Sequence, residues 1–228
     1  MLRAAAVFAA LVFCSISTAH AAQTERVVAV AADGSMTLAT SGAAVLADIY
    51  APQPDVLAQW LMEYALQKEF PFRARGGDDR YGRARVESSL QEDVLNDGAA
   101  VFYASTGTIS DAWRVAESRA REAKRGVWDE RAATVLTTAD KADAAVGTFR
   151  VVEGSITRIY EAKRATYINF GADWREDFSI TIPASLRRSM KPMLQQLKAG
   201  QKIRVRGFIT QENGPMIRLM HRDNMESR

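Results

Sequence analysis

The segment Ala32-Asp33-Gly34-Ser35 decides how the first half of the chain folds, because it is a turn signal between two apolar runs. Val27–Val30 precedes it and Met36–Ala39 follows it, so strand, turn and strand follow one another directly. A second turn at Ser41-Gly42 leads into a third apolar run, Ala44–Tyr50. The sequence therefore predicts three consecutive strands at this point.

Helical spacing follows the three strands. Apolar residues recur on one face of Asp55–Leu66, which predicts a helix with Asp55 as its N-cap. Ser89-Leu90-Gln91-Glu92 has the pattern of a capping box and predicts a short helix that Gly98 ends. Strands are expected at Phe70–Arg75, Ala84–Glu87 and Ala99–Tyr103, and a longer helix begins at Asp111.

Three further strings point to one known family. Asp79-Arg80-Tyr81-Gly82-Arg83 reads D-x-Y-G-R, Ala116–Arg121 reads AExxAR, and Gly126-Val127-Trp128 reads GxW. With Asp33-Gly34 and the Ala51-Pro52 corner, these strings resemble the staphylococcal nuclease (thermonuclease) family. The resemblance covers about Val27 to Glu130 and implies a five-stranded OB-type barrel with helices attached. It also implies a structural role for Trp128, sealing the barrel.

Most positions that carry chemistry in that family differ here. The resemblance places the family's two metal-binding Asp residues at Ser35 and Tyr50, its general-base Glu at Gln53, and a phosphate-binding Arg at Val45. A calcium ion needs several oxygen ligands, above all carboxylates. Glutamine cannot accept a proton near neutral pH, and valine cannot hold a phosphate. The resemblance thus implies a nuclease scaffold without a nuclease site, and no metal site is expected.

One catalytic position of the family is retained, at Arg83. In the family this arginine contacts the phosphate in the transition state, and the tyrosine of the same string, here Tyr81, lies along the nucleotide. Arg80 adds a second guanidinium, and guanidinium groups are forked, permanently charged donors for phosphate oxygens. We expect Arg80, Tyr81 and Arg83 to bind phosphate or nucleic acid weakly. The alternative is a polar loop in which Asp79 pairs with an arginine.

The N-terminus has the order of a secretory signal peptide. Arg3 precedes an apolar run, Ala4–Ile16, and Ala19-His20-Ala21 is an A-x-A cleavage signal. Residues 1–21 are therefore expected to be removed on export, giving a periplasmic or secreted protein; a retained membrane anchor is the alternative. Export removes the single cysteine, Cys14, and leaves His221 as the one histidine, which argues against Cys-His and Ser-His-Asp catalysis.

Two domains are expected after the signal peptide, at residues 22–130 and 147–228. The segment 131–146 is rich in Ala, Thr and Asp, has no apolar stripe and is expected to be a linker. Beyond it come three strands, a helix at Leu186–Leu197 and two strands, which is the order of an OB-fold. The predicted fold class is mainly β with helices (α+β): a thermonuclease-like OB barrel followed by a second small OB-like β-barrel.

The second barrel has candidate ligand residues, because OB-folds bind single strands through basic grooves and stacked aromatics. The candidates are Arg158, Lys163, Arg164, Lys202, Arg204, Arg206, Tyr160, Tyr167 and Trp174. The alternation in Lys202–Arg206 is equally that of any half-buried strand. The string Tyr167–Phe178 is similar to one found in bacterial thermonuclease-like proteins, without an assigned role. With 30 Lys and Arg against 27 Asp and Glu, the net charge of +3 permits a phosphate-bearing partner without arguing for one.

Three functions remain open. The first is an exported, catalytically inactive, thermonuclease-like protein that needs no cofactor and works as a binding or scaffolding module, with nucleic acid or an envelope protein as partner. The alternative is an active, calcium-dependent nuclease that uses displaced carboxylates, for which the candidates are Asp33, Asp48, Asp78 and Asp79. A purely structural envelope protein is a third reading.

Overall fold

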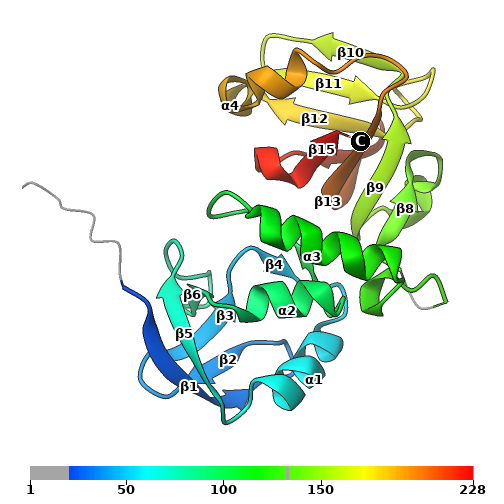
Figure 1. Cartoon of the computed structure of the whole chain (residues 1–228). Coiled ribbons are helices and arrows are strands. Elements are labelled where there is room, and N and C mark those ends of the chain that lie inside the picture. Colours follow the sequence, from blue (N-terminus) through cyan, green and yellow to red (C-terminus); the bar gives the residue numbers. More distant parts are fainter. Residues whose placement is uncertain (1–20, 132–133, 228) are drawn as a thin grey trace, which may run out of the picture.

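The computed structural model describes residues 21–131 and 134–227, and these form two β-rich halves with a helix at their junction (Figure 1). The expected signal peptide lies outside the described residues, apart from Ala21. No helix in the described ranges has the length and apolar character needed to cross a membrane.

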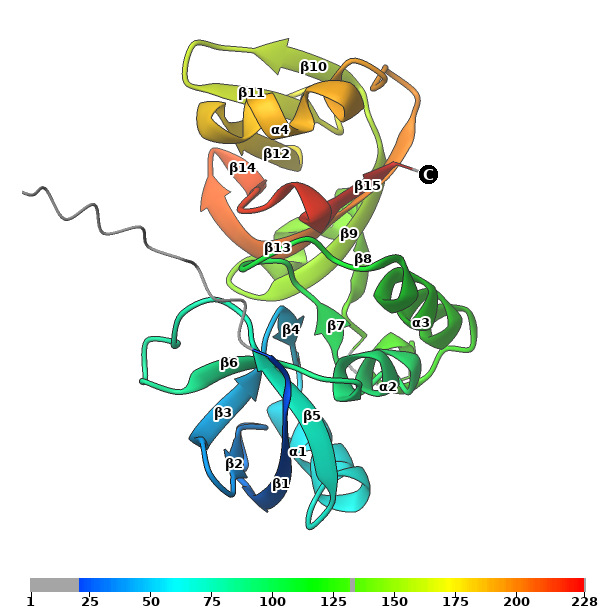
Figure 2. The same ribbon diagram turned by 60° about the vertical axis from the view of Figure 1, so that its left-hand side comes forward.

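The first half is a closed barrel of five strands, β1-β2-β3-β6-β5. All neighbours pair antiparallel except β3 and β6, which are parallel. The strands are β1 (Gln23–Val30), β2 (Met36–Leu38), β3 (Gly42–Leu46), β5 (Glu69–Ala74) and β6 (Ala84–Glu87). Two shorter strands, β4 (Ile49–Tyr50) and β7 (Val101–Phe102), pair with each other and lie between the barrel and the second half (Figure 2).

Helix α1 (Pro54–Tyr64) connects the third and fourth barrel strands and turns its apolar face inward, where Leu57 and Leu61 are buried. Its N-cap is Gln53 and not Asp55, which lies in the first turn of the helix. Trp60 stacks on Tyr64 and donates a hydrogen bond from its indole nitrogen to Asp97, at 2.9 Å. The helix therefore packs on the barrel as the sequence pattern predicts.

Helix α2 (Leu90–Asn96) begins with a capping box one residue earlier than the sequence suggests. The Ser88 hydroxyl accepts from the Leu90 amide at 3.1 Å, and the Gln91 side chain accepts from the Ser88 amide at 2.9 Å. Ser89 caps nothing with its side chain. The helix ends at Asn96, and Gly98, just beyond it, lies against Gly126. A Cβ on Gly98 would lie 2.3 Å from the Arg125 carbonyl oxygen and one on Gly126 would lie 2.1 Å from the Gly98 carbonyl oxygen, so only glycine fits at either position.

The second half repeats the strand order of the first. Its sheet runs β10-β11-β12-β14-β13-β9-β8, where β8 is Leu136–Thr138, and has two parallel pairs, β12 with β14 and β8 with β9. Only two residues separate β9 from β10, so the two strands form one nearly continuous segment. The β9 part of this segment pairs with β13 and the β10 part pairs with β11, toward the two ends of the row of strands. The elements are β9 (Phe149–Ser155), β10 (Arg158–Glu161), β11 (Ala165–Asn169), β12 (Ser179–Pro183), α4 (Ala184–Leu194), β13 (Lys202–Glu212), β14 (Gly214–Arg218) and β15 (Met225–Ser227), which pairs with β13.

The fold class is thus mixed α+β as expected, with a closed five-stranded barrel and a second curled sheet. In both halves a helix connects the third and fourth strands, α1 in the first and α4 in the second. That is the position predicted from the sequence for an OB-type topology. The isoleucine-rich core of the second half, which includes Ile168, Ile180 and Ile217, is completely buried.

The segment expected to be a linker differs from that expectation where the structure describes it. β8 (Leu136–Thr138) pairs in parallel with β9, and the side chains of Val135 and Ala142 are fully buried. The apolar residues of this segment are spread over a strand and two short 3-10 helices, so they make no stripe of constant period. Residues 134–146 are therefore part of the second half: β8 belongs to its sheet, and the two 3-10 helices pack against its core.

Helix α3 (Asp111–Glu122) lies at the junction, with Trp113, Ala116 and Ala120 buried as their spacing predicts. Trp128 does not seal the first barrel. It packs with Val101 from the first half and with Phe149 and Val151 from the second. Its buried face thus belongs to the joint between the halves, for which no local sequence pattern exists.

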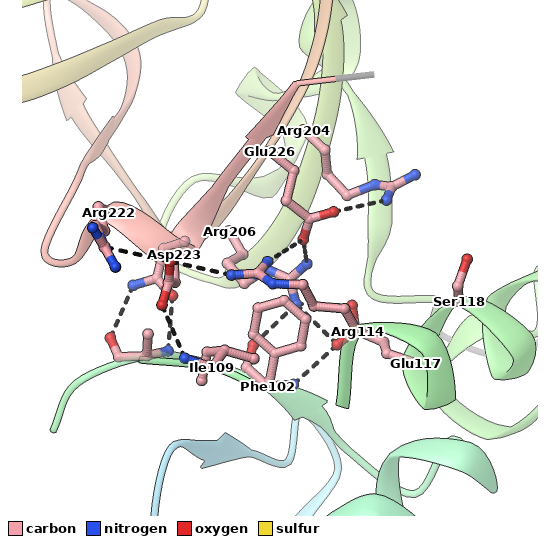
Figure 3. A network of polar contacts seen from close by, with 12 residues as sticks. Phe102, Ile109, Arg114, Glu117, Ser118, Arg204, Arg206, Arg222, Asp223 and Glu226 are labelled. Atoms are coloured by element: carbon pink, nitrogen blue, oxygen red, sulfur yellow. Dashed lines mark hydrogen bonds and ion pairs between the residues drawn. The ribbon is translucent and has the colours of Figure 1, made fainter. Parts of the chain in front are cut away.

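A buried polar network joins the two halves (Figure 3). Arg206 of β13 is 1% exposed and donates to both oxygens of Glu117 on α3, at 2.8 and 2.9 Å, and to the Phe102 carbonyl. Its guanidinium also pairs with Glu226 and lies 3.4 Å from the centre of the Phe102 ring. Asn224 adds two hydrogen bonds to the backbone of Ala104, at 2.8 and 3.0 Å. The halves are therefore held in one fixed arrangement.

Candidate functional site

A cleft of about 390 Å³ opens on the first barrel where three segments meet. They are the β1–β2 turn, the end of β3 with the residues after it, and the loop between β5 and β6. These segments come together because β3 and β6 pair in parallel, with Val45 directly opposite Arg85. Side chains that line the cleft include Asp33, Val45, Tyr50, Asp79, Arg83 and Arg85.

Arg83 is fixed between two carboxylates of this cleft. Its Nε donates to Asp79 at 2.8 Å, and its Nη1 lies 2.5 Å from Asp33. Asp79 also accepts from the backbone amides of Tyr81 and Arg83, at 2.9 and 3.0 Å. Partial desolvation opposes the charge of Asp79, but the hydrogen bonds from Arg83 and Tyr81 outweigh it and lower its pKa to about 2. Hydrogen bonds to Asp79 and Asp33 raise the pKa of Arg83, so the pair stays charged.

The three predicted phosphate-binding residues do lie together. The ring of Tyr81 is 66% exposed, with the Arg80 guanidinium carbon 4.7 Å and the Arg83 guanidinium carbon 5.0 Å from its centre. Arg80 is exposed, whereas Arg83 is half-buried. The loop thus presents an aromatic face between two cations. It also has the Asp79–arginine pair that the alternative reading of this loop requires.

The four positions where family chemistry is replaced have structural roles or apolar character. The Ser35 hydroxyl and amide both donate to Asp33, at 2.7 and 3.0 Å, and lower its pKa. Tyr50 packs against Phe149 of the second half. Gln53 is the N-cap residue of α1, and Val45 is part of the cleft wall.

Asp48, a candidate displaced carboxylate, is fully engaged. Its side chain has no exposed surface and accepts from Arg75 Nε at 2.7 Å and from the amides of Ser105 and Thr106, at 2.6 and 2.8 Å. The hydroxyls of the same two residues donate at 2.9 and 2.8 Å. Burial raises its pKa, but these bonds outweigh burial and the pKa is lowered. Asp48 therefore fastens the segment after β7 to the barrel.

The other candidate carboxylates do not assemble around a common point. Asp33 and Asp79 both point at Arg83, and Asp78 is exposed and outside the cleft lining. Over residues 21–131 and 134–227, no three Asp, Glu, His or Cys side chains gather in a way that could hold a metal ion.

Sequence reasoning missed Arg85, which lines the cleft and has no ion-pair or hydrogen-bond partner for its guanidinium among the described residues. The strand order of the expected barrel could have identified Arg85. In an OB-type barrel the third and fifth strands are parallel neighbours, which puts Arg85 beside Val45, where the family has its phosphate-binding arginine.

Most of the ligand residues expected in the second half fall into two groups. Arg204 and Arg206 are wrong as ligand residues, because they are 2% and 1% exposed and pair with Glu153, Glu117 and Glu226. Strand β13 carries them into the joint. Arg158, Tyr160, Tyr167 and Trp174 lie instead around a second cleft, remote from that network.

Comparison with known proteins places the chain in no characterised family. No protein-family model matches it, and no curated protein matches it. One solved structure that matches is the complex of Stn1 and Ten1 from S. pombe, with a TM-score of 0.29 and 12% sequence identity. The match covers 35% of this chain and 57% of that one, so the chain spans little more than half of its length.

Proposed function

We propose that the chain is a divergent member of the thermonuclease family that has lost hydrolysis and binds phosphate groups of nucleic acid, weakly, in the cleft of its first barrel. The observation that carries the proposal is the charge arrangement in the cleft. Arg83 and Arg85 are directed at one space, whereas Asp33 and Asp79 are bound to Arg83. The strand order of the barrel, and the position of the D-x-Y-G-R loop at its cleft, support membership of the family.

The retained groups favour binding over catalysis. The Arg85 guanidinium has no carboxylate partner to displace, so it can take a phosphate oxygen directly. Arg83 would have to exchange its bond to the half-exposed Asp33 for a bond to phosphate. Because the carboxylates compete with the ligand, the affinity is low and falls with salt.

Hydrolysis lacks its machinery in this proposal. Removal of a single group that stabilises the transition state costs roughly a hundredfold or more. Here the two metal carboxylates, the base and one arginine of the family are replaced by Ser35, Tyr50, Gln53 and Val45. For Asp48 to serve as a displaced ligand, it would have to give up five hydrogen bonds in a buried site.

The protein works outside the cytoplasm in this proposal, in the periplasm or the medium, as a binding or scaffolding module. The A-x-A signal before Ala22 supports export. A partner protein of the envelope is compatible with the same role.

Cleavage and binding assays on the mature chain test the proposal together. Single-stranded DNA and RNA are incubated with calcium and then with EDTA, and turnover is compared with that of Arg83→Ala. We expect no calcium-dependent turnover above buffer. Fluorescence anisotropy with a labelled oligonucleotide should show weaker binding for Arg85→Ala, with a salt slope reduced by about one.

The matched control is Arg188→Ala, an exposed arginine on α4, which should bind like the unmodified chain. Turnover that EDTA and Arg83→Ala both abolish would contradict the loss of hydrolysis. Equal binding by Arg85→Ala and the unmodified chain would contradict the phosphate site.

A further inference from the structure

The sheet of the second half carries a cleft of about 500 Å³ on its outer face. The register brings Arg158 opposite Asn169, and Tyr160 opposite Tyr167, on neighbouring strands β10 and β11. The next strand continues the row, with Ser179 opposite Asn169. Because side chains alternate between the faces of a sheet, the residues between them, such as Ile168, point into the core. One polar, aromatic row therefore forms the floor of the cleft.

Aromatic faces are available in this cleft. The rings of Tyr160 and Tyr167 are stacked, 6.4 Å apart and inclined by 21°. Tyr160 is 52% exposed, and Trp174, on the loop between β11 and β12, is 48% exposed at the rim. Large aromatic side chains normally bury such area, so the exposure of both around one cleft marks a surface for a flat ligand.

The loop that carries Trp174 is built to hold it there. The Asp173 amide donates to the Asp177 carboxylate at 2.8 Å, and the Asp177 amide donates back to the Asp173 carbonyl at 2.8 Å. A Cβ on Gly171 would lie 2.0 Å from the Asp177 carboxylate, and one on Gly214 would lie 2.5 Å from the Asp177 carbonyl. The two glycines thus let this loop close and pack against the β13–β14 hairpin. This accounts for the Gly, Asp and Trp residues of the string Tyr167–Phe178.

The lining of the cleft contains one cation, Arg158, and one carboxylate, Glu212, and further cations lie beside it. Arg158 lines it, and the β10–β11 turn beside it carries the exposed side chains of Lys163 and Arg164. Within the described ranges, none of these three cations has a carboxylate partner. Glu161, the acid nearest to them in sequence, is paired with Arg187 at 3.2 Å. A second guanidinium, that of Arg175, lies 4.6 Å from the Trp174 ring.

We propose that this cleft binds single-stranded nucleic acid, with a base stacked on Tyr160 or Trp174 and the phosphate backbone along Arg158 and the β10–β11 turn. Stacked aromatics flanked by cations are the combination that holds a single strand without sequence preference. The unpaired cations favour this ligand over a neutral glycan, which would stack on the same rings but leave the charge unused. The site is independent of the cleft in the first barrel.

Intrinsic fluorescence gives a direct readout, because Trp174 is the exposed tryptophan of the mature chain. Trp60, Trp113 and Trp128 are 9%, 6% and 3% exposed. We expect a twelve-residue oligothymidylate, added to the mature full-length protein at low salt, to quench the emission. Trp174→Phe should keep the binding, measured by anisotropy of a labelled oligonucleotide, and lose the quenching.

Single substitutions assign the affinity to this cleft. Trp174→Ala and Tyr160→Ala should each weaken oligothymidylate binding by about 5- to 150-fold, the range that loss of one stacked base contact gives. Tyr64→Ala, at a similarly exposed tyrosine on the first barrel, should leave binding unchanged. Circular dichroism and the melting temperature of each variant show whether its fold is intact.

Three results would overturn the proposal. One is the absence of both quenching and binding with oligothymidylate and oligouridylate at low salt. Another is binding that Arg85→Ala abolishes but Trp174→Ala leaves unchanged, which would place the ligand in the first cleft alone. The third is quenching by a neutral oligosaccharide without quenching by the oligonucleotides.

Discussion

The ring of Tyr50 stacks on that of Phe149, with centroids 4.1 Å apart and planes inclined by 29°. Tyr50 belongs to the first barrel and Phe149 to the second sheet, and Tyr103 and Phe208 meet Phe149 edge-on. The resemblance implies a metal-binding Asp at position 50. Tyr50, which stands there, instead makes an aromatic contact in the joint.

Tyr50→Ala should destabilise the protein by about 2 kcal/mol, less than the 3–5 typical of a fully buried aromatic residue, because Tyr50 is half-buried. Urea unfolding of the mature chain measures the change. Tyr81→Ala is the control: its ring is 66% exposed, so the effect should stay within about 0.5 kcal/mol. Equal effects of the two substitutions would contradict a role of Tyr50 in the joint.

Arg206→Ala should cost about 3–5 kcal/mol of unfolding free energy, because it leaves Glu117 buried without its counter-charge. Combining Arg206→Met with Glu117→Leu should recover a large part of this loss, since both charges of the buried pair between α3 and β13 are removed. Thermal and urea unfolding compare the variants. A cost below about 1 kcal/mol for the single substitution would show that water reaches the network.

The pKa of the Asp79 carboxyl should be about 2 in the folded protein, compared with its ordinary value of 3.8. Since the folded-state pKa is the lower one, the pair with Arg83 contributes stability above pH 4, and this contribution is lost as the pH falls from about 4 to 2. Carboxyl chemical shifts in an NMR titration follow the group. Arg83→Ala should return the pKa toward its ordinary value, whereas Arg80→Ala should not; no change with Arg83→Ala would show that the backbone amides alone are responsible.

Cleavage after Ala21 should leave a mature chain that begins at Ala22, because Ala19-His20-Ala21 follows an apolar run of the length that signal peptidase substrates have. Intact mass of the protein from the envelope or medium fraction measures it. A full-length chain in the cytosol would contradict export.

Local chemistry was enough to predict much of the fold. Ala84–Glu87 was predicted as a strand and is β6, because the turn residues on both sides of it are unambiguous. The interpretation of Lys202–Arg206 failed for a physical reason. Alternation predicts one solvent-exposed face, but β13 pairs with β9 and β15 and both of its arginines are buried, Arg206 against Glu117 of α3 and Arg204 against Glu153 and Glu226. The packing of the two halves against each other decides which face of that strand is buried. The alternation of residues within the strand does not carry this information.

The cleft of the first barrel could be predicted in outline and not in detail. The D-x-Y-G-R string placed Arg80, Tyr81 and Arg83 together correctly. Arg85 was overlooked because it is distant in sequence from Val45, and only the parallel pairing of β3 and β6 makes them neighbours.

The Arg206 network also sets the geometry of multivalent binding. Because it fixes the two halves relative to each other, the distance between the two clefts stays constant. A single strand long enough to reach both would make its second contact as an intramolecular step, at an effective concentration set by the strand alone. Avidity would then rise abruptly at a threshold length of oligonucleotide, and a variant with a loosened joint would replace that step by a gradual increase.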